Sequence, residues 1–253
     1  MVMVSHLHKF IFLKTHKAAG TSIEMYLEPF CAAPGRVVKE RTKAVVSAFG
    51  VVGQRMHGGH PELGGAFAWQ NHSYAKAVKQ ELGRDIWRGY TKLTAVRNPF
   101  DRMVSAYYWR NRKEVIPDDQ PFAETRALFR AFVLSEAMTN DAPIVHIKER
   151  FIIDDAVRYE NMLGDLTRLG ARLGYDPAAT ALPLTKETVS QRHGRAYWDY
   201  YEDDATVQSV RKQLAWVFEH YDYPTTPEPV VATTVVADSP AGPGGAVVKA
   251  IGR

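Results

Sequence analysis

Residues 10–26 read FIFLKTHKAAGTSIEMY, and this stretch divides into three parts of different character. The apolar run Phe10 to Leu13 is typical of a buried strand. A short polar turn at residues 14–20 follows it, and Thr21 and Ser22 then open a segment that is typical of a helix. The stretch therefore predicts a strand, a loop and a helix in succession, and the rest of the chain is organised around this junction.

The helix expected at this junction begins in a way that favours a bound anion. Backbone N–H groups in the first turn of a helix lack partners within the helix, and the helix dipole places positive charge there. Gly20 lets a ligand approach the backbone closely. Thr21 and Ser22 add hydroxyl donors, and the lysines Lys14 and Lys17 add charge. The loop predicts a phosphate or sulfate site, although a buried strand with a capped helix and solvated lysines would use the same residues.

This loop differs from a Walker loop, in which a lysine follows the glycines and precedes the hydroxyl residue that binds magnesium. Here Lys17 precedes Gly20, and neither Gly-Lys-Thr nor Gly-Lys-Ser occurs anywhere in the chain. The sequence therefore predicts an anion that is held without a required metal. The run His-Gly-Gly-His at residues 57–60 has no third ligand at a convincing spacing, and Cys31 stands alone, so no metal site is predicted.

The composition is that of an ordinary globular protein, long enough for one large α/β domain. The chain has 253 residues, of which 45% are hydrophobic and 24% are charged. Lysine and arginine number 32 against 28 acidic residues, which gives a net charge of +4. This mild excess fits a small anionic ligand. Because the sequence shows neither a dense basic stripe nor a recognisable binding module, we predict no nucleic acid partner.

The cysteine content and the hydropathy bear on location. A single cysteine cannot form an intrachain disulfide, which is typical of a reducing compartment. The N-terminal residues lack a long apolar signal core, and no apolar run approaches the ~20 residues of a membrane span. We therefore expect a cytoplasmic protein without a transmembrane segment. The sequence predicts no oligomeric state.

A second junction of the same kind lies at residues 91–112. Residues 91–97 read TKLTAVR and predict a strand. Asn98 and Pro99 suit the cap and the first position of a helix that should run to about residue 112.

This second junction carries another pair of anion-binding side chains. Ser105 follows Arg97 by eight residues, just over two helical turns, so both can face the same side. Arg97 offers a planar fork for phosphate and Ser105 offers a hydroxyl donor, which together predict a second anion site. Read alone, Arg97 could equally pair with the nearby Asp101.

Histidines between the two junctions are candidate bases. Residues 31–65 are rich in glycine and predict an irregular excursion with one strand, and His60 lies inside it. Ser73 can cap a helix that ends near Gly83, which places His72 at a loop-to-helix corner. Such corners are a usual position for chemistry. His72 is the preferred base, and His60 is the alternative.

The remainder of the chain predicts packing elements. Helices are expected at residues 122–138, 161–173 and 203–221, and a strand is expected at residues 156–159. A loop at residues 177–196 includes Arg192, which could close over a bound nucleotide. Residues 1–224 are expected to form one domain, and residues 225–253, rich in proline, alanine and glycine, a flexible tail.

Two of these motifs resemble a known family, the sulfotransferases that use 3′-phosphoadenosine 5′-phosphosulfate (PAPS). FLKTHKAAGTS resembles their 5′-phosphosulfate loop, and AVRNPFDRMVSAY, residues 95–107, resembles their 3′-phosphate motif. The similarity extends from about residue 9 to residue 223, and it points to the carbohydrate branch, which has bacterial members. The resemblance implies a P-loop NTPase-like α/β fold with three layers, in which helices flank a central parallel sheet.

The resemblance also implies roles for single residues. Lys17 matches the catalytic lysine that contacts the bridging oxygen of the donor, and His72 matches the histidine that serves as the base. Together with the charge and hydroxyl arguments above, this predicts a donor-binding set of Lys14, Lys17, Ala19, Gly20, Thr21, Ser22, Arg97, Ser105 and Arg192.

The sequence thus predicts an enzyme that moves a sulfuryl group from PAPS to a hydroxyl group and releases 3′-phosphoadenosine 5′-phosphate (PAP). The family branch alone suggests a carbohydrate acceptor, in a glycan or a glycolipid. Two alternatives stay open. One is a nucleotide or small-molecule kinase on a related fold, against which the missing Gly-Lys-Ser weighs; the other is a module that binds the nucleotide or an anionic glycan without turnover.

Overall fold

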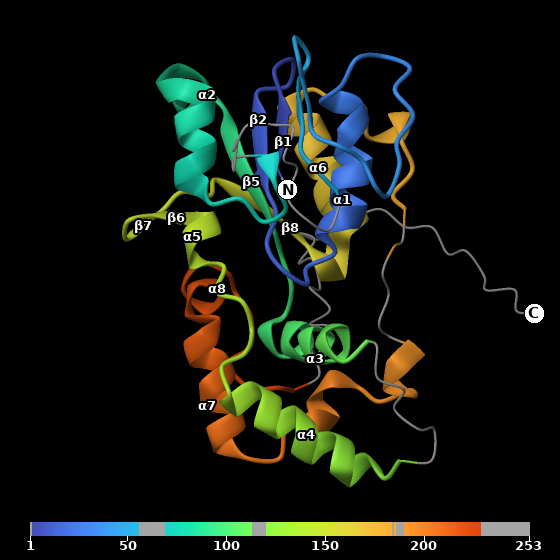
Figure 1. The fold of residues 1–253 in the computed structure, drawn as a ribbon, viewed down its shortest axis with the longest axis vertical. Helices are drawn as coiled ribbons and strands as arrows, with labels where there is room; N and C mark the ends of the chain where they lie inside the picture. The colour runs from blue at the N-terminus through green and yellow to red at the C-terminus, as the bar shows by residue number, and fades with distance from the viewer. Residues whose placement is uncertain (1, 56–68, 113–119, 184, 186–189, 229–253) are drawn as a thin grey trace, which may run out of the picture.

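The computed structural model describes residues 2–55, 69–112, 120–183, 185 and 190–228. Its central element is a six-stranded sheet with the strand order β3-β4-β1-β2-β5-β8 (Figure 1). The strands are β1 (Val2–Ser5), β2 (Phe10–Leu13), β3 (Val45–Ser47), β4 (Gly50–Val52), β5 (Thr91–Val96) and β8 (Asp155–Arg158). β2, β5 and β8 run parallel, whereas β1 pairs antiparallel with β2 and β4, and β3 pairs antiparallel with β4.

The predicted central parallel sheet is therefore only partly correct, because the sheet is mixed. β1 is not among the predicted strands, and it reaches β2 through residues 6–9 alone. So short a hairpin can join only antiparallel strands, since a parallel pair needs a crossover of a dozen or more residues. The chain has such crossovers between β2 and β5 and between β5 and β8. Parallel order is confined to these three strands.

The glycine-rich stretch after α1 contains two strands, β3 and β4, where a single strand is predicted. Gly50 begins β4 with a φ of 148°, and a Cβ atom there would lie 1.9 Å from the carbonyl oxygen of Val4. Only glycine allows β4 to approach β1 so closely. His57 and His60 lie outside the described residues.

Helices cover both faces of the sheet and one of its ends. They are α1 (Gly20–Leu27), α2 (Ala75–Gly89), α3 (Pro99–Arg110), α4 (Phe122–Leu134), α5 (Ala142–Val145), α6 (Met162–Leu173), α7 (Asp204–Gln213) and α8 (Ala215–His220). In Figure 1, α1 and α6 lie on one side of the sheet and α2 lies on the other. α3, α4 and α7 form the lower part of the molecule in this view.

Both faces of β2 are buried, which gives the sheet a helical layer on each side. Phe10 and Phe12 belong to a core cluster that includes residues of α1 and α6. Ile11 and Leu13 belong to a second cluster that includes residues of α2, α3 and α4. A strand buried on both faces is apolar at every position, which explains why the run FIFL predicts it. The α/β class and the helices on both faces agree with the predicted fold.

Helix boundaries differ from the predicted ones where other contacts replace a local cap. Tyr74 and not the predicted Ser73 is the N-cap residue of α2, and the Ser73 hydroxyl donates to the carbonyl oxygen of Gln70 instead. Gly83 has a φ of 78° and kinks α2, which continues beyond it. The predicted last helix is divided into α7 and α8.

The predicted tail is described only at its start. The hydroxyl group of Tyr197 donates a 2.8 Å hydrogen bond to the carbonyl oxygen of Glu228, so the chain still contacts the domain there. Residues 229–253 lie outside the described part, and the boundary at residue 224 stays a prediction. No helix in the described part is both long and apolar enough to cross a membrane.

Candidate active site

The two predicted strand-to-helix junctions meet at one edge of the sheet. β2 and β5 are parallel neighbours, with Phe10 opposite Thr91 and Leu13 opposite Thr94, so their carboxyl ends lie side by side. The loop after β2 enters α1, and the loop after β5 enters α3. A cavity of about 480 Å³ is lined by both loops. Ligands of α/β sheets typically bind at this edge.

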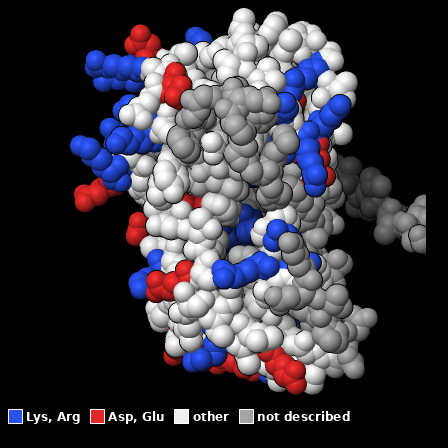
Figure 2. Space-filling model, in the orientation of Figure 1, with Lys and Arg blue, Asp and Glu red and all other residues white. Residues whose placement is uncertain are grey.

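The structure brings almost all of the predicted site residues to this cavity. Those that line it are Lys14, Lys17, Ala19, Gly20, Thr21, Ser22, His72, Arg97 and Ser105. Arg192 does not line the cavity, and its side chain contacts Asp101 instead. Figure 2 shows Lys and Arg side chains gathered near the middle of one face, between the sheet and the lower helices.

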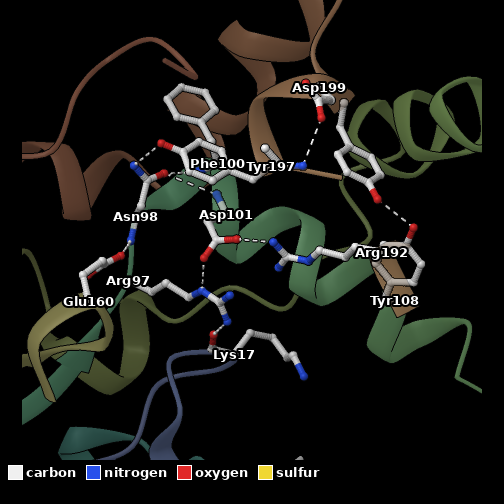
Figure 3. Close-up of polar contacts among 12 residues, drawn as sticks. Lys17, Arg97, Asn98, Phe100, Asp101, Tyr108, Glu160, Arg192, Tyr197 and Asp199 are labelled. Carbon is white, nitrogen blue, oxygen red and sulfur yellow. Dashed lines mark hydrogen bonds and ion pairs between the residues drawn. The ribbon is translucent and has the colours of Figure 1, made fainter. Parts of the chain in front are cut away.

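A direct contact joins the two junctions. Nη1 of Arg97 donates a 3.4 Å hydrogen bond to the carbonyl oxygen of Lys17 (Figure 3). Lys17 and Ala19 have φ angles of 59° and 54°, in the left-handed region that residues other than glycine rarely adopt. The ammonium group of Lys17 lies 4.2 Å from the centre of the Trp109 ring, on α3. The lysine thus spans from the first junction to the helix of the second.

Lys14 lies beneath the first turn of α1 with its charge already paired. Its ammonium group donates to Glu24, at 2.9 Å, and to the hydroxyl group of Thr21, at 3.0 Å. Glu24 is fully buried and Lys14 is 8% exposed. A Cβ atom at Gly20 would lie 2.6 Å from Cγ of Lys14, so the glycine makes room for this side chain. Lys14 therefore shapes the loop and orients Thr21.

Ser22 connects α1 to a distant loop. Its hydroxyl oxygen accepts a 3.2 Å hydrogen bond from the backbone N–H of Thr185, and the two hydroxyl groups also lie 3.2 Å apart. Thr185 lines the cavity as well. The first turn of α1 is thereby held against the segment that precedes Arg192.

Three buried charges form a cluster at the second junction, and Arg97 is the member that lines the cavity. Asp101 accepts a 2.6 Å hydrogen bond from Nε of Arg97 and another of 2.6 Å from Nη1 of Arg192 (Figure 3). The guanidinium group of Arg97 also lies 3.8 Å from the centre of the Tyr159 ring. The pairing of Arg97 with Asp101 and its place in the cavity wall, which the sequence presents as alternatives, occur together. Arg192 orients Arg97 through Asp101.

The start of α3 holds this cluster in place. The side-chain oxygen of Asn98 accepts from the backbone N–H groups of Phe100, at 3.0 Å, and Asp101, at 3.3 Å. The backbone N–H of Asn98 donates to Glu160, at 2.6 Å. The Asn-Pro helix start that the sequence predicts is confirmed, with Pro99 at the first helical position.

His72 faces the cavity in a defined tautomer. Its Nδ1 atom lies 3.1 Å from the carbonyl oxygen of Lys14, and because a carbonyl only accepts, Nδ1 carries the proton. Nε2 then keeps a lone pair. Burial lowers the pKa of His72 far below its ordinary value, and positive charge on His16 and Lys14 lowers it further. The imidazole is therefore neutral, which is the form that can accept a proton.

His16 is a site residue that the sequence does not single out. Its ring stacks on the ring of His72, with the centroids 3.5 Å apart and the planes at 13°. Nδ1 of His16 bonds to Asp141, whose other oxygen accepts from Arg102. Burial alone would raise the pKa of Asp141, but Arg102 and His16 outweigh it and hold that pKa below its usual value. The only local signal for His16 is its place between two lysines.

The described residues hold no cluster of three or more potential metal ligands. The histidines of residues 57–60 lie outside that part of the chain. The described lining of the cavity includes five lysine and arginine side chains and several hydroxyl groups.

A comparison with protein families matches residues 1–135 to the sulfotransferase family. The match covers more than half of the 253 residues and includes both junctions and His72. The chain therefore belongs to the sulfotransferase family, and the suspected resemblance is confirmed at this level. Comparisons with curated proteins and with solved structures gave no match.

Membership makes the chain a sulfotransferase by class. The matched region ends before Asp141 and Arg192, so these two positioning groups come from outside it.

Proposed function

We propose that this protein transfers the sulfuryl group of PAPS to a hydroxyl group of a carbohydrate acceptor and releases PAP, without a required metal. The observation that carries the proposal is the meeting of Lys17 and Arg97 at one cavity, from junctions 80 positions apart. One junction presents a helix N-terminus with hydroxyl groups, and the other presents a guanidinium group. This arrangement suits a ligand with anionic groups at both ends.

The lining of the cavity supports a donor with several negative charges. Lys14, Lys17, Arg97, Arg110 and Arg112 contribute to it, and none of the described lining residues is an aspartate or a glutamate. Two of the five cations are paired from behind, by Glu24 and Asp101. The cavity keeps a net positive character that an adenosine phosphosulfate with a 3′-phosphate would complement.

The 5′ end of the donor would be held at the first junction. Backbone N–H groups at the start of α1, near Ala19 and Gly20, would face the phosphosulfate, and Thr21 and Ser22 would donate through their hydroxyl groups. Thr21 is already oriented by the ammonium group of Lys14, at 3.0 Å. PAPS, when bound, supplies an activated sulfuryl group whose leaving oxygen gains negative charge, and the Lys17 ammonium would stabilise that charge.

The 3′-phosphate would be held at the second junction. Arg97 has its Nε atom committed to Asp101 and its Nη1 atom near the Lys17 carbonyl, so the edge that faces the cavity is fixed in direction. Ser105 lines the cavity from α3 and adds a hydroxyl donor. Preorganised donors of this kind favour a bound anion because little reorganisation is needed on binding.

His72 is the proposed base. Its Nε2 atom has the lone pair, because Nδ1 donates to the Lys14 carbonyl oxygen. The proton of the acceptor hydroxyl group would move to Nε2 as the acceptor oxygen attacks the sulfuryl group.

The wall formed by Trp109, Phe132 and Met138 offers apolar surface for a sugar ring, and this end of the cavity is the proposed acceptor site. The single cysteine leads us to propose a cytoplasmic location.

The experiment is a transfer assay with radiolabelled PAPS and a cell extract, followed by fractionation of the labelled products. Lys17→Ala should lower turnover by about 10²–10³-fold, as expected for the loss of a preorganised charge. Lys148→Ala is the matched control, because Lys148 is exposed and also has a positive φ, of 58°. Equal losses in the two variants would contradict the assignment of Lys17.

The base is tested by His72→Asn, since asparagine tolerates the φ of 56° at this position. Turnover should fall by about 10²–10⁴-fold, the usual contribution of general base catalysis. Near-normal transfer by this variant would exclude His72 as the base. Transfer of phosphate from ATP would favour a kinase instead, and tight binding of PAP without transfer to any acceptor would favour a binding module.

A further inference from the structure

His16 is held more rigidly than a cavity-lining side chain requires. Its backbone N–H donates to Oδ2 of Asp141 at 3.0 Å, and its ring Nδ1 bonds to Oδ1 of the same carboxylate. Asp141 therefore grips both the backbone and the ring. The side chain of His16 remains 24% exposed at the cavity.

The carboxylate that grips His16 is itself fixed from behind. Asp141 accepts a hydrogen bond from Arg102 of α3, and the side chains of both are fully buried. The guanidinium group of Arg102 lies 5.9 Å from the centre of the Trp216 ring, on α8. A buried, charge-assisted chain of this kind has little freedom to rearrange. The orientation of the His16 ring is thereby set through Asp141, which precedes α5, through Arg102 of α3 and through Trp216 of α8.

The His16 ring, held in this way, stacks against the ring of His72. The two imidazole rings lie almost parallel, at 3.5 Å between centroids, and Nδ1 of His72 lies 3.1 Å from the Lys14 carbonyl oxygen. Its φ of 56° lies in the left-handed region, where a residue needs support from its surroundings. A hydrogen bond at one edge fixes one point of a ring, and a stacked partner fixes its plane.

We propose that His16 is the positioning residue of His72, and that Arg102, Asp141 and His16 form one support that holds the base in its working orientation. The inference rests on the proposed function, because it assigns His72 the proton of the acceptor. When that proton leaves the hydroxyl oxygen for Nε2, the His72 ring becomes a cation. Burial and the neighbouring positive charges disfavour that cation, so the support acts on the orientation of the His72 ring and not on its charge.

Two substitutions separate the stack from the carboxylate contact. His16→Phe keeps an aromatic face against His72 and loses the ring bond to Asp141. His16→Asn keeps a donor for Asp141 and loses the aromatic face. Because the support needs both the stack and its anchor, each variant should lose about 10–10²-fold in kcat, the usual effect of a misplaced catalytic group.

The coupling is measured by placing His16→Asn in the His72→Asn background. A residue that acts only through His72 adds no further loss there, within about 2-fold for coupled sites. The same loss in both backgrounds would show that His16 acts independently and would overturn the proposal. So would an asparagine or phenylalanine variant that keeps the wild-type kcat. PAP affinity, measured by calorimetry, should not change.

An NMR measurement that needs no turnover tests the support of His72 independently of the proposed function. Long-range ¹H–¹⁵N spectra of the wild-type protein should show His72 as a single Nδ1–H tautomer, and His16→Asn should give a mixture of tautomers. His16→Gln serves in place of His16→Asn if that variant does not fold. Failure of the wild-type protein to transfer sulfate would refute the proposed function alone, whereas an unchanged His72 tautomer in the variants would refute the support.

Discussion

Replacing Asp101 by asparagine tests how much the buried charges at the donor site stabilise the protein. Asp101 accepts 2.6 Å hydrogen bonds from both Arg97 and Arg192, and the three residues are 5–9% exposed. Asparagine has the same shape without the charge, so Asp101→Asn leaves two buried guanidinium groups without their counter-ion. Removing one partner of a buried ion pair costs about 3–5 kcal/mol, and we expect the free energy of unfolding to fall by that amount.

An exposed ion pair of nearly the same length provides the matched control. Lys212 and Glu136 lie 2.7 Å apart, with side chains that are 73% and 49% exposed. Pairs in such surroundings contribute about 0–1 kcal/mol, because water screens the charges. Glu136→Gln makes the same chemical change as Asp101→Asn, so burial is the main difference between the two variants.

The assay is thermal unfolding followed by circular dichroism, with and without saturating PAP. For a chain of this size about 1 kcal/mol changes Tm by roughly 2–4 °C, so Asp101→Asn should melt about 6–20 °C below the wild-type protein. The control should melt within about 4 °C of it. PAP should recover part of the loss, because its 3′-phosphate would supply negative charge to Arg97. A Tm equal to that of the control variant would refute the reasoning from burial.

Three further substitutions test the loop and the helix around the site. Gly20→Ala should push aside the Lys14 side chain, which would otherwise lie 2.6 Å from the new methyl group, and should lower the free energy of unfolding by about 1–3 kcal/mol. Denaturant titrations measure this loss, and an unchanged free energy of unfolding would mean that the loop adapts. Trp109→Leu removes the ring that lies 4.2 Å from the Lys17 ammonium and should lower kcat by about 2–30-fold, from the ~0.5–2 kcal/mol of a cation–π contact, while PAP affinity measured by calorimetry stays the same. Asn98→Ala removes the cap of α3 and should cost about 0.5–2 kcal/mol of stability, so a variant as stable as the wild-type protein would show that the cap is dispensable.

Local pattern was sufficient to predict both junctions. Phe10–Leu13 is apolar at every position because both faces of β2 are covered, and such a run bounded by polar residues predicts a buried strand. Asn98 caps α3 with its own side chain, as its residue type predicts. These features depend on residues close in sequence, so they can be predicted before any tertiary contact is known.

Partners across the sheet could not be predicted in this way. The mixed sheet depends on β1, a four-residue strand whose pairing with β2 and β4 is decided by the hairpin at residues 6–9. The charge of Lys14 suggests a ligand contact, yet its ammonium group is held by Glu24 on the buried face of α1. Residue type alone does not show whether a lysine near a cavity faces a ligand or a carboxylate beneath it.

The contact between His16 and Asp141 could not be predicted from the local sequence. The two residues are 125 positions apart, and Asp141 precedes a helix of only four residues, which has no distinctive pattern. Asp141 and Arg192 also lie beyond the segment that matches the sulfotransferase family. The side chains proposed to meet the donor therefore come from the matched segment, whereas charged groups that orient them come from the remainder of the chain. Substitutions of Asp141 and Arg192 should consequently change catalysis through the orientation of His16 and Arg97 rather than through direct contact with the donor.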